Sequence, residues 1–205
     1  MVIIISTEGI MGRIKSAWEI ALERTENIEV DAEKIRHSAN IEAIRKIAGA
    51  YLLSDEDTEE STREKLLQYG SDDKREALGQ TIINALSLPQ EEKSDDKKAQ
   101  RLSFLLSIAV PSGDEIQDFL GQVLAHIAQY PVHREQLMNQ LKEQFEPMLR
   151  EKEEKLRAQY GEAPHLSLEN DKEYRKVANQ YLERLRDQYQ EALDDAKKQL
   201  KEALS

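Results

Sequence analysis

The last 70 or so residues of the chain carry apolar side chains at steps of three or four positions. In a first stretch the steps connect Leu137, Leu141, Phe145, Met148, Lys152 and Leu156, with one lysine among them. In a second stretch they connect Tyr174, Ala178, Tyr181, Leu185, Tyr189, Ala192, Ala196, Leu200 and Ala203. Because an α-helix turns about every 3.6 residues, each set falls on one helical face. The repeat of about 11 residues is typical of helices that run straight or wind around each other with a slight right-handed twist.

Between the two stretches the segment GEAPHLSLEND interrupts the pattern, so the chain is predicted to turn there into a long antiparallel αα-hairpin. We predict its first helix over residues 132–160. A capping box at Asn170 and Glu173 is predicted to begin the second, which runs to the end of the chain. Pro147 lies inside the first helix and removes a backbone hydrogen bond there. Since the apolar spacing continues across Pro147, we expect a kink rather than a helix end.

Residues 14–130 carry shorter helical patterns that are separated by prolines, glycines and charged runs. A capping box at Ser16 and Glu19 is predicted to begin the first helix, with Trp18 turned inward. Further helices are predicted from Asp31 to about Leu53, over residues 62–69, and from Ser71 or Asp72 to before Pro89. Another is predicted in the apolar segment AQRLSFLLSIAV, which Pro111 ends. The last begins at a capping box at Ser112 and Glu115 and ends before Pro131.

The predicted fold class is therefore all-α, with an N-terminal helical bundle at residues 14–130 followed by the coiled-coil-like hairpin at residues 131–205. Residues 1–13 are expected to be disordered or to precede the native start, which is either Met1 or Met11. Composition agrees with this fold: only 8 glycines and 5 prolines occur, and 34% of the residues are charged. Such compositions favour long helices with much solvent-facing surface.

The charge and the missing cysteines exclude several classes of function. The formal net charge is −11, whereas nucleic acids and anionic membranes are bound through lysine and arginine. Without cysteine the chain has no disulfide, no thiolate metal site and no cysteine nucleophile. No apolar run is long enough to span a membrane. We therefore expect a cytoplasmic protein that binds neither nucleic acid nor membrane.

Residues with catalytic or metal-binding chemistry form no recognisable set. His126 and His133 are separated by Pro131, which is expected to break the helix, and no carboxylate completes a metal site with them. The acidic run after Asp55 lacks the glycine and the final glutamate of a calcium-binding loop. Glycine-rich phosphate-binding loops and nucleophile motifs do not occur. We predict no catalytic residue, no metal site and no cofactor.

Four segments together resemble an uncharacterised bacterial family, a domain of unknown function: SAWEIALERTENIEVD, RKIAGAYLLSD, YPVHREQLMNQLKEQFEPMLREKEEKLRAQYG and DQYQEALDDAK. The resemblance runs from about Ser16 to near the C-terminus. It implies a small bacterial cytosolic protein with this helical layout, and no activity, ligand or site residue.

These patterns favour a non-enzymatic protein–protein interaction or scaffold protein. The hairpin stripes are only partly filled, with Lys152 and several alanines, and so leave surface for another helix. We predict that Lys152, Tyr174, Tyr181 and Tyr189 contribute to a surface that binds a protein partner or a second copy of the chain. One alternative is an assembly or secretion chaperone for a basic or amphipathic client. Another is an enzyme with a carboxylate site that the motifs do not reveal.

Overall fold

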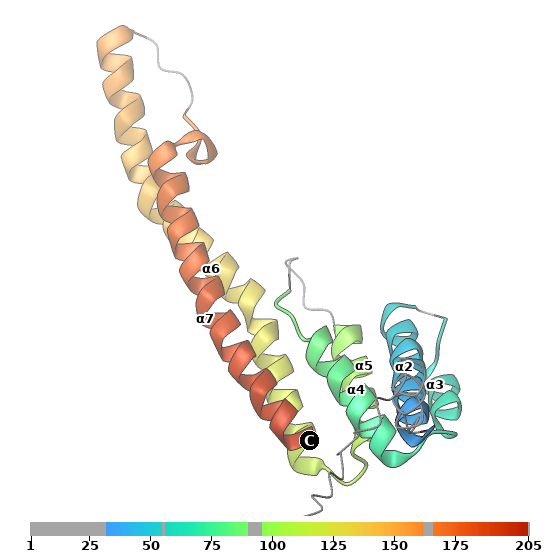
Figure 1. The fold of residues 1–205 in the computed structure, drawn as a ribbon. Helices are drawn as coiled ribbons and strands as arrows, with labels where there is room; N and C mark the ends of the chain where they lie inside the picture. The colour runs from blue at the N-terminus through green and yellow to red at the C-terminus, as the bar shows by residue number, and fades with distance from the viewer. Residues whose placement is uncertain (1–31, 55, 90–95, 162–165, 205) are drawn as a thin grey trace, which may run out of the picture. The chain divides into compact units, whose positions relative to one another are not determined.

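The computed structural model describes residues 32–54, 56–89, 96–161 and 166–204, and within these it is all-helical, with no strand. The helices are α2 (Ala32–Leu53), α3 (Glu59–Leu66), α4 (Ser71–Ala85), α5 (Asp96–Ala109), α6 (Asp114–Tyr160) and α7 (Lys172–Leu204), and a 3-10 turn η1 (Leu168–Asn170) precedes α7 (Figure 1). The predicted all-α fold with its long helical pair is confirmed. The predicted helix around Trp18 lies outside the described residues.

Local interactions determine where several helices begin and end. The side chain of Thr58 accepts a hydrogen bond from the backbone N–H of Ser61, so α3 begins earlier than the predicted residue 62. Helix α6 ends at Tyr160 and is followed by Gly161, which has a φ of +80° and whose N–H donates to the carbonyl of Arg157 at 2.9 Å. Glycine adopts this left-handed conformation without a steric penalty, and it is a common way for a helix to end.

The predicted helix end before Pro131 is wrong, because α6 continues through both Pro131 and Pro147. Pro131 is buried and lies one helical turn after buried Ile127, so its ring forms part of the apolar face of the helix. A proline inside a helix costs about 3 kcal/mol. We attribute the continuity to burial of this face, which offsets that cost.

Two predicted capping boxes are also wrong. The residue before α6 is Gly113, and no side chain caps this helix end. Instead, the side chain of Gln117 donates to the carbonyl of Val110 across the preceding turn. Helix α7 is capped by Asp171 rather than by Asn170, since the Asp171 carboxylate accepts from the backbone N–H groups of Glu173 and Tyr174, each at 2.9 Å.

One apolar core joins α2, α3, α4 and α5 to the N-terminal part of α6 and the C-terminal part of α7. Its fully buried large residues are Ile44, Leu66, Leu78, Ile82, Leu86, Leu102, Leu105, Leu106, Leu120, Leu193 and Leu200. Each such side chain contributes about 1.5–3 kcal/mol through its removal from water. The bundle and the near part of the hairpin therefore share a single core.

A second, smaller cluster lies farther along the hairpin and contains Leu141, Tyr174 and Ala178, with Leu137, Met138, Phe145, Leu168 and Val177 packed against it. The ring of Phe145 meets that of Tyr174, and the ring of His133 meets that of Tyr189. Residues later in α7 thus pack against residues earlier in α6, so the two helices are antiparallel (Figure 1).

The C-terminal end of α7 is held against α4. The guanidinium of Arg75 donates to the carbonyl of Ala203 at 2.9 Å, and Leu204 is buried. Leu204 approaches Gly79 so closely that a Cβ atom at Gly79 would lie 3.1 Å from its Cδ1 atom. Glycine at position 79 therefore allows this tight contact.

Residues Ala39–Ser205 form one compact unit. The predicted boundary between bundle and hairpin at residues 130 and 131 stays a prediction, although α6 crosses it without a break. The prediction for residues 1–13 lies outside the described residues. None of the described helices combines the length and apolarity that crossing a membrane needs.

We expect Pro147→Ala to stabilise the protein. Pro147 is exposed inside α6 and leaves the carbonyl of Glu143 without its helical N–H partner. Alanine restores that donor, so the free energy of unfolding in urea should rise by about 1–3 kcal/mol. Gln144→Ala, at a neighbouring exposed position, should change it by less than about 0.5 kcal/mol. An unchanged or lowered stability of the Pro147→Ala variant would contradict the expectation.

Candidate functional site

The four residues predicted to form an interaction surface have different environments on the hairpin. Tyr174 and Tyr189 are buried, with 4% and 6% of their surface exposed, and both pack within the hairpin. Tyr181 is 45% exposed, and the guanidinium of Arg184 lies 5.7 Å from its ring centroid. Lys152 is about half exposed and is ion-paired. Only Tyr181 and Lys152 therefore present substantial surface to solvent, and the functional role of all four stays a prediction.

The buried face of α7 differs from the predicted stripe in its second half. After Tyr189 it continues through Leu193, Leu200 and Leu204, whereas Ala192 and Ala203 are exposed. A leucine buries more apolar surface than an alanine, so the helix turns its leucines towards α4 and α6. On α6, Met148 of the predicted stripe is exposed and its neighbour Leu149 is partly buried.

Tyr189 is the centre of an aromatic cluster between the two hairpin helices. Its hydroxyl is hydrogen-bonded to Nδ1 of His133 at 2.6 Å, and donates this bond when the imidazole carries its proton on Nε2. The ring of His126 stacks on Tyr189 with 4.6 Å between centroids, and Tyr130 meets it edge-on at 5.3 Å. Burial raises the pKa of Tyr189.

The sequence contained the signal for this cluster. His126, Tyr130 and His133 are spaced four and three apart, which places them on one face of a continuous helix. The expectation that Pro131 ends the helix separated the two histidines and hid that face. In the structure both histidines pack against Tyr189, a role that had not been predicted for them.

Tyr174 closes the distal cluster but leaves one polar atom unmatched. Its ring meets Phe145 edge-on with 5.4 Å between centroids. Its hydroxyl is buried and has no hydrogen-bond partner among the described residues. Burial, together with the negative charge of Glu169, raises the pKa of Tyr174.

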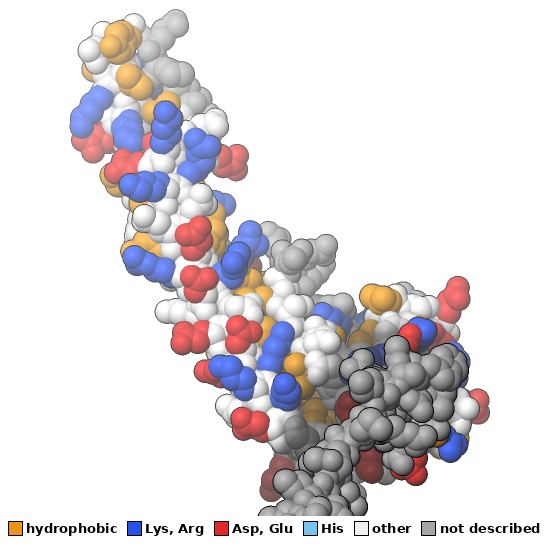
Figure 2. Space-filling view, in the orientation of Figure 1, with side chains coloured by type: hydrophobic (Ala, Val, Ile, Leu, Met, Phe, Trp, Pro, Cys, Tyr) orange, Lys and Arg blue, Asp and Glu red, His pale blue; other side chains and the backbone are white. Residues whose placement is uncertain are grey.

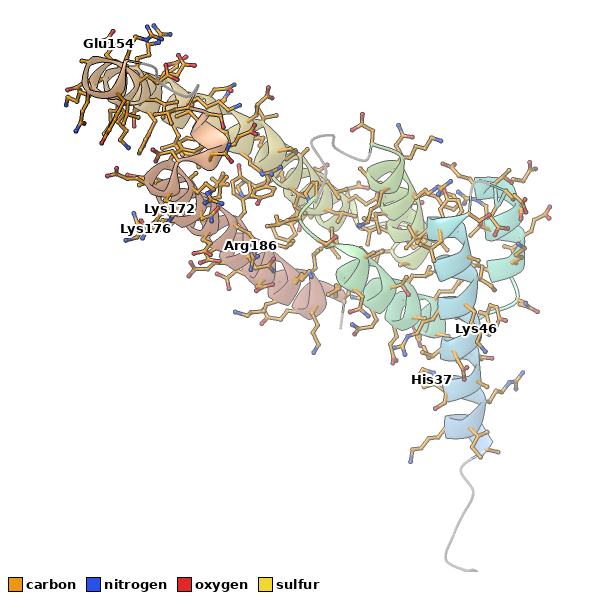
Figure 3. The ribbon with its side chains drawn as sticks, turned by 90° about the horizontal axis from the view of Figure 1, so that it is seen from above. His37, Lys46, Glu154, Lys172, Lys176 and Arg186 are labelled. Carbon is orange, nitrogen blue, oxygen red and sulfur yellow. The ribbon has the colours of Figure 1, made fainter. Side chains whose placement is uncertain are left out.

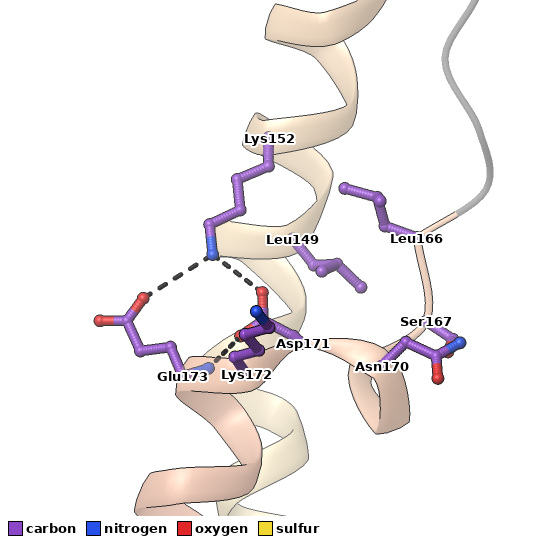
Figure 4. Close-up of a pocket in the computed structure, with 8 residues that line it drawn as sticks. All are labelled: Leu149, Lys152, Leu166, Ser167, Asn170, Asp171, Lys172 and Glu173. Carbon is purple, nitrogen blue, oxygen red and sulfur yellow. Dashed lines mark hydrogen bonds and ion pairs between the residues drawn. The ribbon is translucent and has the colours of Figure 1, made fainter.

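Lys152 and Asp171 connect the two helices near the tip of the hairpin (Figure 4). The ammonium of Lys152 lies 2.9 Å from Oδ2 of Asp171 and 3.7 Å from Oε2 of Glu173. The hydrogen bond from Lys152, followed by the backbone N–H of Tyr174, lowers the pKa of Asp171. The same bond to Asp171 raises the pKa of Lys152. Asp171 thus both caps α7 and binds the cation on α6.

A shallow hollow of about 450 Å³ lies beside this pair, and Figure 4 shows the residues that line it. They are Leu149, Lys152, Leu166, Ser167, Asn170, Asp171, Lys172 and Glu173. Its charged groups Lys152, Asp171 and Glu173 are already paired with one another. Within the described ranges no three histidine, aspartate or glutamate side chains are placed to hold a metal ion. The hollow therefore offers no charged group that a ligand would meet unpaired, apart from Lys172.

Charge is distributed unevenly along the hairpin. Residues 172–186 of α7 contain five basic and two acidic residues, whereas residues 187–204 contain three basic and five acidic ones. On the face seen in Figure 2, basic side chains are more frequent towards the tip and acidic ones nearer the core of the bundle. Lys172 and Lys176 project from the first turns of α7 in Figure 3, and Glu154 lies near the end of α6.

We expect the same substitution at two tyrosines of α7 to have opposite effects on stability. Tyr174→Phe removes a buried hydroxyl that has no hydrogen-bond partner within the described part of the chain, and should raise the free energy of unfolding by up to about 1–2 kcal/mol. Tyr189→Phe removes a hydroxyl bonded to His133, and should lower it by about 1 kcal/mol. Urea denaturation of both variants is the measurement. Effects of equal sign would contradict the assigned environments.

We expect Asp171→Ala to destabilise α7 more than Lys152→Met does. The first variant removes a helix cap as well as the ion pair, and caps are worth about 1 kcal/mol. Because the pKa of Asp171 is lowered on folding, its contribution is present above the ordinary aspartate pKa and disappears as the pH falls through the folded value. The stability difference between wild type and Asp171→Ala, measured in urea, should therefore shrink below about pH 4. A difference that persists unchanged in acid would show that the carboxylate charge is not what stabilises α7.

Comparison with known proteins gives one match. Residues 63–202 match a family of unknown function, DUF6657. No curated protein and no solved structure matches the chain. The match begins at residue 63, later than the resemblance expected from Ser16, and includes α4 to α6 and almost all of α7. It spans well over half of the chain, which therefore belongs to the family of unknown function DUF6657.

Proposed function

We propose that the protein is a non-enzymatic interaction protein whose hairpin binds a protein partner. One observation carries this proposal. In its distal half the hairpin consists of two helices with a small core, in which Leu141, Tyr174 and Ala178 are the buried residues among those that the structure describes. A two-helix layer leaves a continuous exposed flank on each helix, and such flanks are suited to packing against another helix.

Exposed apolar side chains on the hairpin support the same proposal. Val132 and Met148 on α6 and Tyr181 on α7 are each about half exposed. Single exposed apolar residues are common on protein surfaces, so each alone carries little weight. Here all three lie on the two hairpin helices, which carry the proposed interaction surface.

A chaperone for a basic or amphipathic client is the second candidate. The observation that favours it is the acidic half of the hairpin that adjoins the bundle. Residues 114–141 of α6 contain one basic and four acidic residues, and residues 187–204 of α7 are acidic as well. A basic client segment would be attracted to this half. The proposed enzyme with a carboxylate site has no supporting observation among the described residues.

The proposal predicts that cross-links in cells come from the hairpin. A photoreactive phenylalanine analogue at Tyr181 or Met148 should give adducts of discrete mass in cells that naturally make the protein. The same analogue at Leu53 or Leu67, which are exposed outside the hairpin, serves as the matched control and should give few or none.

Mass spectrometry of the adducts distinguishes the two candidates. A basic client bound mainly through residues 187–204 would favour the chaperone. Adducts with one defined protein, or with the chain itself, would favour the interaction protein. Equal cross-linking from the hairpin and from the control positions would contradict both.

A further inference from the structure

We propose that the partner of the hairpin is a second copy of the same chain, which packs antiparallel along α7. This inference rests on the proposed function and specifies its partner. The surface involved is an exposed flank of α7, here called the α7 flank, which consists of Tyr181, Arg184, Gln188, Ala192, Asp195 and Gln199. All six residues are exposed.

The α7 flank is a continuous helical stripe beside the buried face. Its members are separated by steps of three, four, four, three and four residues, which keeps them on one side of the helix. The buried face runs through other residues of α7, including Tyr189, Leu193 and Leu200. From Tyr181 to Gln199 the flank extends over about 27 Å at the rise of an α-helix. Packing within one chain therefore leaves the flank open along several turns.

The order of residues on the flank is self-complementary. In an antiparallel pair related by a two-fold axis, residues equally distant from the centre of the stripe face each other. Such an axis places Arg184 opposite Asp195 of the second copy, and Gln188 opposite Ala192. The Arg184–Asp195 pair then occurs twice in the dimer. Tyr181 lies opposite Gln199, and the small side chain of Ala192 near the centre permits the two backbones to approach.

The wider charge distribution favours the same orientation. The first half of α7, with its excess of basic residues, comes to lie beside the acidic second half of the other copy. A parallel arrangement would place basic beside basic and acidic beside acidic instead, and like charges in an interface are strongly disfavoured. Residues 114–141 of α6 add to the acidic side, whereas residues 142–160 contain five basic and five acidic residues and are neutral.

Both charged residues of the flank can change partner at little cost. The carboxylate of Asp195 meets Lys198 at 2.9 Å, in a pair whose side chains are 60% and 72% exposed. Such exposed pairs contribute about 0–1 kcal/mol. The guanidinium of Arg184 lies over the ring of Tyr181, another residue of the flank. A client of unrelated sequence is not expected to carry its charges in the order that complements the α7 flank. A second copy of the chain carries that order when it packs antiparallel.

The test is a charge exchange between two variants, followed by sedimentation velocity over a range of protein concentration. In a dimer of the Arg184→Glu variant or of the Asp195→Arg variant, positions 184 and 195 carry the same charge at both symmetry-related contacts. Each substitution should therefore weaken the dimer about tenfold or more. Mixing the two variants restores opposite charge at both pairs, and a heterodimer should form with near wild-type affinity. High salt should weaken the wild-type dimer.

Lys176→Glu and Asp194→Arg are the matched controls. They make the same charge changes on α7 at exposed positions that are not on the α7 flank. Each should leave the dimer within about twofold of wild type, and mixing them should add nothing. All four substitutions are at exposed helical positions, so every variant is expected to fold. Circular dichroism of each variant checks this.

Three results would overturn the inference: a wild-type chain that is monomeric up to about 1 mM at low salt, flank variants that behave as the controls do, or a mixture that fails to restore the dimer. These failures are distinguishable from failure of the proposed function. A monomeric chain whose hairpin still cross-links to another defined protein would reject the self-association and retain the interaction role.

Discussion

Helix α6 keeps its course through Pro131, and the rest of the structure depends on that continuity. Its first half packs into the core that it shares with α4, α5 and α7, and its second half pairs with the start of α7. If the helix ended at the proline, α7 would be the one hairpin helix to run unbroken through both clusters. Because burial of the proline ring on the apolar face offsets the missing hydrogen bond, α6 also connects both apolar clusters.

The periodic spacing of apolar residues was sufficient to predict the helices and their antiparallel pairing. Leu141 and Tyr174 occupy the buried faces that the spacing indicated, and α6 ends at the predicted Tyr160. Helix ends were predicted less well, since they depend on single side chains. Thr58 and Asp171 both cap helices, whereas Ser112 does not, although all three residue types favour that position.

The candidate surface was predictable only in outline. The spacing assigned Ala192 to the predicted stripe, whereas its neighbour Leu193 is the residue that is buried, and this choice depends on what packs there. The contact of α4 with the end of α7 decides it, and that contact joins residues more than a hundred positions apart. The orphan hydroxyl of Tyr174 is likewise invisible in the sequence, since it results from the shape of its surroundings rather than from any residue pattern.

The contact of Arg75 with Ala203 and of Gly79 with Leu204 gives the chain an unusual order of assembly. Leu200 and Leu204 belong to the shared core, yet they follow α4 in the sequence by more than a hundred residues. Until a ribosome has made them, helix α4 has an uncovered apolar face. The core therefore closes only once the chain is available as far as Leu204, and contacts between such distant parts of a chain form slowly.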